Sequence, residues 1–236
     1  MFRSPDVTVA GAGVFGAWIA YHLTKRGARV RLVDLHGAAN ARASSGGETR
    51  ILRMSYGADE IYTRSMIASM PQWKQVCGDL FHRTGVLLTS DARDPYLRAT
   101  HATLERCGVA HEFTRNIKNH FPQIRLERNT AGIWEPESGV MEARRAVQRV
   151  IEECGLTVEI GDAKGVKGPV VFACGPWLPA LFPKLLKGRI RPTRQEVCFF
   201  GTPAGDATFS RVPAWIAFRE GGYSVPGKVV RLKRKD

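Results

Sequence analysis

A glycine-rich turn, residues 11–16 (GAGVFG), and the acidic residue Asp34 have the spacing of a dinucleotide site. In the pattern G-x-G-x-x-G the first glycine permits a tight turn and the second lets the backbone approach a pyrophosphate. The third glycine lets a helix pack closely on a strand. A carboxylate roughly twenty residues further on can accept a hydrogen bond from a ribose 2′-hydroxyl and would repel the 2′-phosphate of NADP. The predicted dinucleotide contacts are Gly11, Gly13, Val14, Phe15, Gly16 and Asp34.

The elements around this turn have the order that the motif requires. Residues 7–10 form a short apolar run that predicts a strand, and residues 17–23 predict a helix that ends at Lys25-Arg26-Gly27. Residues 28–33 predict a second strand, with Asp34 at its end. The alternative is a glycine-rich turn in an unrelated α/β protein. The apolar stretch 7–23 also resembles a signal peptide, but its internal glycines and the poor cleavage site after it argue against one.

A second polar segment, residues 44–53 (SSGGETRILR), combines hydroxyl groups, glycines and two arginines. Hydroxyls suit a phosphate, and guanidinium groups suit a phosphate or a carboxylate. If the segment is helical, Arg50 and Arg53 lie on neighbouring positions of one face. The alternative, which composition alone favours, is a solvated loop with surface arginines.

These segments together resemble the D-amino-acid-oxidase-like flavoproteins, and within them the group of monomeric sarcosine oxidase, N-methyltryptophan oxidase and peroxisomal sarcosine/pipecolate oxidase. The Thr49-Arg50-x-x-Arg53 block is the most specific part of the resemblance. The resemblance covers nearly the whole chain. Its blocks, in chain order, are residues 11–16, 34, 44–53, 83–88, 121–122, 135–140, 170–177 and 191–195.

The resemblance implies an α/β fold in which a discontinuous, Rossmann-like FAD-binding domain is joined to a smaller mixed α+β substrate domain. The FAD domain would comprise residues 1–82 and 138–182, and the substrate domain residues 83–137 and 183–236. FAD would be bound non-covalently, because none of the five cysteines stands at the family's covalent position. No metal is expected. The further cofactor contacts implied are Ser44, Ser45, Thr49, Arg50, Gly175 and Trp177.

The resemblance also implies an activity, the oxidation of a secondary or primary amine beside a carboxylate, with oxygen reoxidising the flavin. Arg53 matches the arginine that binds the substrate carboxylate, with an ion pair to Glu48 as the alternative. Lys233, or else Lys228, matches the lysine that promotes the reaction with oxygen, and a solvated tail lysine is the alternative. Tyr223 matches a tyrosine of the substrate pocket.

The chain departs from the family at three places. Gly46 stands where the family has a histidine, and only residues 160–168 remain of a β-meander before the second flavin strand. The chain also stops before the family's usual end, without the segment that carries the covalent cysteine and a second carboxylate-binding cation. Three hypotheses stay open: a flavin amine oxidase, a non-catalytic or partner-dependent flavin-binding fragment, and a nicotinamide-dependent dehydrogenase.

Composition limits the partners. The chain has 236 residues, 44% of them hydrophobic, and a formal net charge of +13, which admits nucleic acid, a membrane surface or a small anion. Its basic runs, residues 184–194 and 228–235, lack interleaved aromatic residues, so a solvated face is favoured over nucleic acid. Five scattered cysteines without a C-x-x-C motif predict a reduced, cytoplasmic protein without disulfides. The expected partners are an amino-acid or amine substrate, oxygen, and a second copy or a completing chain.

Overall fold

The computed structural model describes residues 5–126, 129–186, 188–193, 197–200, 208, 212–218, 222–224 and 229–231. The chain divides into two compact units. The first unit comprises Met1–Arg50, Val76–Leu80 and Glu142–Thr193, and the second comprises Ile51–Gln75, Phe81–Met141 and Arg194–Asp236. These bounds differ from the predicted domains chiefly in residues 51–75, which were predicted to belong to the FAD domain and lie in the second unit. The assignment of FAD binding to one domain and substrate binding to the other stays a prediction.

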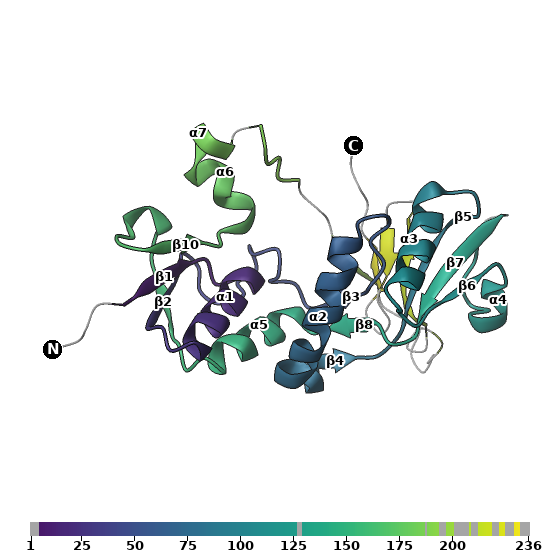
Figure 1. Cartoon of the computed structure of the whole chain (residues 1–236), viewed down its shortest axis with the longest axis horizontal. Coiled ribbons are helices and arrows are strands. Elements are labelled where there is room, and N and C mark those ends of the chain that lie inside the picture. Colours follow the sequence, from purple (N-terminus) through teal and green to yellow (C-terminus); the bar gives the residue numbers. More distant parts are fainter. Residues whose placement is uncertain are drawn as a thin grey trace. The chain divides into compact units, whose positions relative to one another are not determined.

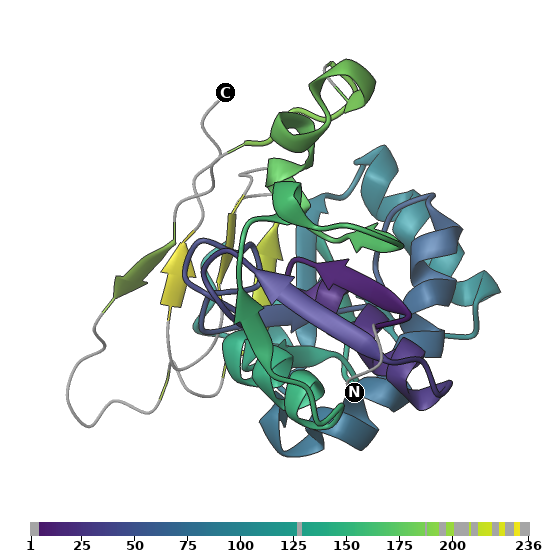
Figure 2. The same cartoon turned by 90° about the vertical axis from the view of Figure 1, so that its left-hand side faces the viewer.

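A parallel four-stranded sheet is the centre of the first unit, with strand order β10-β1-β2-β9. Strand β1 (Val7–Ala10) lies between β2 (Val30–Asp34) and β10 (Val170–Phe172), and β9 (Val158–Ile160) extends the sheet beyond β2. Figure 2 shows β1 and β2 side by side. Because all four strands are parallel, their carboxyl ends lie at one edge of the sheet. Strand β1 ends at this edge between β10 and β2. Such an edge is the usual ligand site of an open parallel sheet.

Two helices of the first unit, α1 (Val14–Lys25) and α5 (Ala143–Glu152), pack against each other (Figure 1). The small residues Ala17 and Ala20 form the buried side of α1. The apolar stripe of α5, which includes Ala146, Val147, Val150 and Ile151, is buried, and α1 is its helical neighbour. The remaining helical segments of this unit are η1 (Gly78–Leu80), η2 (Ala163–Gly165), η3 (Gly175–Trp177), α6 (Leu178–Leu181) and α7 (Pro183–Leu186).

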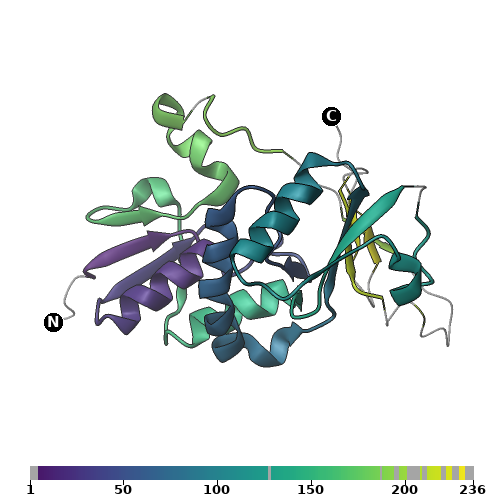
Figure 3. The same cartoon turned by 45° about the vertical axis from the view of Figure 1, so that its right-hand side comes forward.

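The second unit contains a mixed five-stranded sheet of order β13-β12-β5-β7-β6. Strand β5 pairs antiparallel with β7 and parallel with β12, and helix α3 (Pro95–Arg106) covers it through Leu97 and Leu104, which pack with Leu88 and Ile133 (Figure 3). The strands are β5 (Val86–Asp91), β6 (Glu112–Thr114), β7 (Thr130–Glu135), β12 (Ala214–Ala217) and β13 (Gly222–Ser224). This unit also includes α4 (Ile117–His120) and most of α2 (Glu60–Cys77).

Two smaller sheets complete the described structure. One has the order β3-β8-β4, and the other pairs β11 with β14. Their bounds are β3 (Arg50–Leu52), β8 (Gly139–Met141), β4 (Phe81–His82), β11 (Cys198–Phe200) and β14 (Val229–Arg231). The predicted α/β class with a βαβ unit is confirmed. Strand β10 is half-buried, since it is an edge strand of the described four-stranded sheet. Within the described residues, none of the helices combines the length and the apolar character that a membrane crossing requires.

Candidate functional site

The glycine turn after β1 is packed so tightly that two of its glycines cannot carry a side chain. Gly11 has φ +107°, and a Cβ there would lie 2.5 Å from the carbonyl oxygen of Ala173. A Cβ on Gly16 would overlap the carbonyl oxygen of Gly11. Both positions bring α1 close to β1 and to the segment after β10. The spacing therefore places the beginning of α1 at the carboxyl edge of the parallel sheet.

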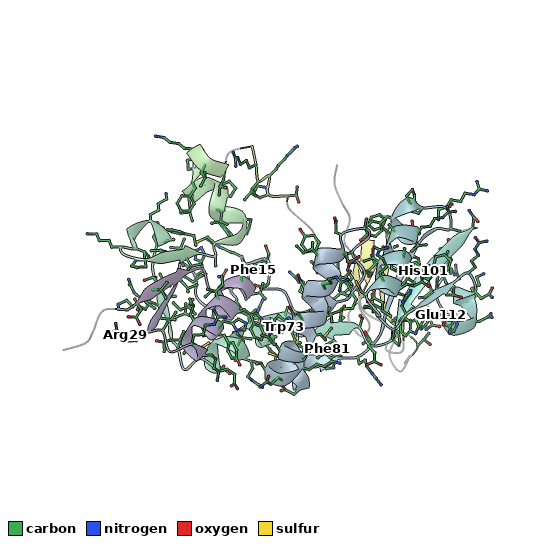
Figure 4. All side chains as sticks on the ribbon, in the orientation of Figure 1. Phe15, Arg29, Trp73, Phe81, His101 and Glu112 are labelled. Atoms are coloured by element: carbon green, nitrogen blue, oxygen red, sulfur yellow. The ribbon has the colours of Figure 1, made fainter. Side chains whose placement is uncertain are left out.

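The N-terminus of α1 has the chemistry of an anion site. Its N-cap, Gly13, has no side chain, and its first turn has no acidic residue. The Val14 N–H donates to Ser45 Oγ at 3.1 Å. A hydroxyl that accepts this bond still has its own hydrogen to donate, so Ser45 can serve an anion beside the helix end. Phe15 projects from this end of α1 with 75% of its surface exposed (Figure 4).

Asp34 lies at the end of β2, beside the glycine turn. Its Oδ2 accepts the Ala12 N–H at 2.8 Å, and its Oδ1 accepts the His36 N–H at 2.8 Å and the Asn40 Nδ2–H at 3.2 Å. A carboxylate offers about four acceptor positions, so this arrangement orients Asp34 and leaves room for a ribose hydroxyl. The amide of Asn40 orients the carboxylate of Asp34. The glycine motif does not include Asn40, so the sequence did not predict this contact.

The segment that follows, residues 44–50, forms a loop closed on itself by Arg50. The guanidinium of Arg50 donates to the Thr49 carbonyl at 2.7 Å and to the Ser44 carbonyl. The helical condition for a shared face of Arg50 and Arg53 is not met, because Arg50–Leu52 is strand β3, which neighbours β8. Arg50 begins this strand and Arg53 follows its last residue, so the helical spacing of the two arginines does not apply.

The end of β10 forms another part of the same edge. The Ala173 N–H donates to the Ala10 carbonyl at 2.7 Å, which continues the pairing of β10 with β1. Gly175 then has φ +52°, with no neighbouring atom within 4 Å of a Cβ placed there. Burial raises the pKa of the Cys174 thiol, so this thiol is neutral. Trp177 is 46% exposed. Contacts of Gly175 and Trp177 with a cofactor stay predictions.

Arg53 belongs to the second unit and retains donors for an anion. Its Nη1 donates to Ser55 Oγ at 3.2 Å, and its guanidinium lies 4.5 Å from the centre of the Tyr56 ring. Within the described part of the second unit, no carboxylate lies at ion-pair distance from Arg53. Burial raises the pKa of the Tyr56 phenol, and the charge of Arg53 acts in the opposite direction. The stacking on Tyr56 holds the cation without neutralising it.

A buried carboxyl group anchors the segment that carries Arg53. Glu135, the last residue of β7, is 1% exposed. Its Oε2 accepts the Met54 N–H and the Ser138 hydroxyl, both at 2.7 Å. Its Oε1 has no hydrogen-bond partner among the described residues. The family resemblance marked only the block 135–140, and nothing in the residue pattern indicated that Glu135 bonds the backbone beside Arg53.

Three of the predicted site residues lie wholly or partly outside the part of the chain that the structure describes. Tyr223 pairs through its backbone with Ile216, in β13, and its side chain is not described. Lys228 and Lys233 lie outside the described residues. Their predicted roles, like those of the other site residues, stay predictions.

A family model described as DAO, FAD dependent oxidoreductase, matches residues 6–232. The chain belongs to this family. The prediction of FAD in place of a nicotinamide cofactor is thereby confirmed. The residues of the first unit fit such a cofactor: glycines leave a cradle at the beginning of α1, no acidic residue occupies its first turn, and Asp34 lies at the end of β2.

Several named proteins are similar to this chain. Peroxisomal sarcosine oxidase of Mus musculus is 35% identical over 222 residues, which are 83% of this chain and 57% of that protein. The Homo sapiens protein of the same name is 31% identical over the same shares. N-methyl-L-tryptophan oxidase of Citrobacter koseri is 25% identical over 97% of this chain and 68% of that protein. The chain thus spans 57% of the length of its mouse and human relatives.

Solved structures support the fold. NikD, described as an unusual amino acid oxidase essential for nikkomycin biosynthesis, has a TM-score of 0.69 and 24% identity over 99% of this chain and 70% of its own. Fructosyl peptide oxidase from E. terrenum has a TM-score of 0.76 and 18% identity over 98% of this chain and 64% of its own. At these identities the likeness concerns the fold alone.

Proposed function

We propose that the chain belongs to an oxidase of small amino acids, which converts a secondary or primary amine, as in sarcosine or a cyclic imino acid, to the imine. Bound FAD supplies the two-electron acceptor for the hydrogen on the carbon beside the nitrogen. Oxygen is the proposed final acceptor, with hydrogen peroxide as its product, and water hydrolyses the imine. The observation that supports an amino-acid substrate best is Arg53, a half-buried cation stacked on Tyr56 that keeps donors for a carboxylate.

In this proposal the two arginines have different tasks. Arg53 binds the substrate carboxylate, since the planar fork of a guanidinium can donate two parallel hydrogen bonds to it. Arg50 holds the loop 44–50 through the carbonyls of Thr49 and Ser44. Ser45 and the N-terminus of α1 bind the pyrophosphate, and Asp34 accepts a ribose hydroxyl.

Arg53→Lys should weaken a carboxylate ligand more than it weakens FAD. Lysine keeps the charge but loses the fork, which should reduce the affinity for a monocarboxylate such as propionate by about 1–2 kcal/mol. Calorimetric titration of the FAD-loaded protein with propionate, beside titration of the apoprotein with FAD, measures both effects. Arg50→Lys is the matched variant, and it should affect FAD more than propionate. If Arg53→Lys reduces both affinities equally, the division of tasks between the arginines is wrong.

Asp34→Ala should weaken FAD binding by about 1–3 kcal/mol, the range for a charge-assisted hydrogen bond that is lost. The variant removes the acceptor for the ribose and leaves the Ala12 N–H without its partner. Asp79→Ala removes another carboxylate of the first unit, one that pairs with Arg149 on the surface, and should leave the affinity unchanged. Fluorescence titration with FAD tests both variants, and an unchanged affinity in Asp34→Ala would show that Asp34 does not meet the ribose.

The proposed activity is tested with the purified 236-residue chain. Hydrogen peroxide formed from sarcosine, N-methyltryptophan or proline supports the oxidase, and the rates compare the substrate classes. Bound FAD without any turnover supports the alternative, a flavin-binding fragment that is non-catalytic or needs a partner chain. Acid precipitation tests the mode of binding, since non-covalent FAD should pass entirely into the supernatant. The cytoplasmic location and self-association stay predictions.

A further inference from the structure

Arg144, the second residue of α5, is bonded to the loop 44–50 across 98 residues of sequence. Its Nε and Nη2 both donate to the carbonyl oxygen of Gly46, at 3.0 and 2.7 Å. The two donors of one guanidinium edge thus converge on a single carbonyl. All of these atoms belong to the first unit.

The backbone at the beginning of α5 continues this attachment. The Arg144 N–H donates to the Gly47 carbonyl at 3.2 Å, and the Ala143 N–H donates to the Glu48 carbonyl at 2.8 Å. The first amides of a helix have no partner within the helix, and the side chain of the N-cap Glu142 accepts no capping bond from them. The loop carbonyls therefore cap α5, while α5 fixes three successive peptide groups of the loop.

The opposite side of the loop is equally constrained. A Cβ on Gly46 would overlap the carbonyl oxygen of Asn40, so no side chain fits there, and the family's histidine could not occupy this position without moving the loop. Asn40 in turn donates to Asp34 at 3.2 Å. The residue before Gly46 in the loop, Ser45, accepts the Val14 N–H. Arg144 therefore holds the loop that joins the two proposed FAD-binding groups, the end of α1 and Asp34.

We propose that Arg144 is a positioning residue for the cofactor. It fixes the carbonyl of Gly46 and with it the place of Ser45 at the N-terminus of α1, without itself contacting FAD. The inference rests on the proposed FAD site. Helix α5 lies outside the glycine motif. Through Arg144 it nevertheless determines the position of the part of the site that binds the pyrophosphate.

The variants Arg144→Gln and Arg144→Lys test this inference, with Arg145→Gln as the matched control. Arg145 is the next residue of the same helix, and its side chain is 63% exposed in a surface ion pair with Glu142. Loss of the paired charge-assisted bonds to Gly46 should raise the dissociation constant for FAD about tenfold or more in Arg144→Gln. Lysine retains one donor, so Arg144→Lys should lie between this variant and the wild type. Arg145→Gln should bind FAD as the wild type does.

Adenosine serves as the second ligand, because it carries the ribose but no phosphate. Asp34 can still bind this ribose, since the bonds of Asp34 to Ala12 and His36 do not involve the loop. Arg144→Gln should therefore change the affinity for adenosine by less than about twofold, and the thermal midpoint of the apoprotein should stay close to that of Arg145→Gln. Trypsin should cut the apoprotein faster after Arg42 or Arg50 when the loop has lost its anchor.

An unchanged FAD affinity in Arg144→Gln would overturn the inference, as would equal weakening of FAD and adenosine with a lower thermal midpoint. The second result would indicate general destabilisation of the sheet. A wild-type chain that binds neither ligand would contradict the proposed FAD site itself. The tryptic cleavage rate separates these failures, because it reports the attachment of the loop to Arg144 without any cofactor.

Discussion

Gly11→Ala should abolish measurable FAD binding and lower the free energy of unfolding of the apoprotein by about 2–5 kcal/mol. Two costs add at this residue. A φ of +107° lies outside the conformations that a side chain tolerates, and the added Cβ would lie 2.5 Å from the backbone oxygen of Ala173. Backbone atoms cannot move aside as a flexible side chain can. The turn must therefore open, which separates the beginning of α1 from β10.

Urea denaturation of the apoprotein and titration with FAD measure the two effects of Gly11→Ala. Gly165→Ala is the matched control in the same unit, because a Cβ there meets no atom within 4 Å and Gly165 has no positive φ. The control should stay within about 0.5 kcal/mol of the wild type and bind FAD normally. Gly11→Ala with wild-type FAD affinity would show that the turn does not have to be this tight to bind the cofactor.

Glu135→Ala should lower the free energy of unfolding by about 2–4 kcal/mol. The substitution leaves the Met54 N–H and the buried Ser138 hydroxyl without their acceptor and creates a cavity at the end of β7. It should also weaken binding of a monocarboxylate, because Met54 follows Arg53 directly in the chain. Urea denaturation measures the stability, and titration with propionate measures the effect on the ligand.

Two further variants separate the acceptor of Glu135 from its charge. Glu135→Gln keeps an oxygen for Met54 and Ser138, so it should lose less than half as much stability as Glu135→Ala. Glu137→Ala, which removes an exposed partner of Arg83, should change the stability by less than about 1 kcal/mol. If Glu135→Ala is no less stable than Glu135→Gln, the carboxyl group does not anchor this segment.

The residue pattern alone determined the βαβ unit and its cofactor class. Val7–Ala10, the glycine turn, α1 and β2 follow one another within 34 residues, so local rules of turn geometry, helix ending and strand alternation suffice to predict them. The stripe of α5 was predictable for the same reason, because its period is a local property. These features fix where the N-terminus of α1 and Asp34 must lie.

The tertiary structure alone decided what holds the site in place. The bonds of Arg144 to Gly46 and of Glu135 to Met54 join residues 98 and 81 positions apart, and no spacing rule connects them. The residue pattern did not decide between a helix and a loop at Arg50–Leu52, and the pairing with β8 made it a strand. Hydrogen-bond partners of this kind are chosen by which segments meet when the sheets and helices pack. The periodicity of a segment determines which of its faces is buried. Which other segment packs against that face depends on the packing of the whole unit.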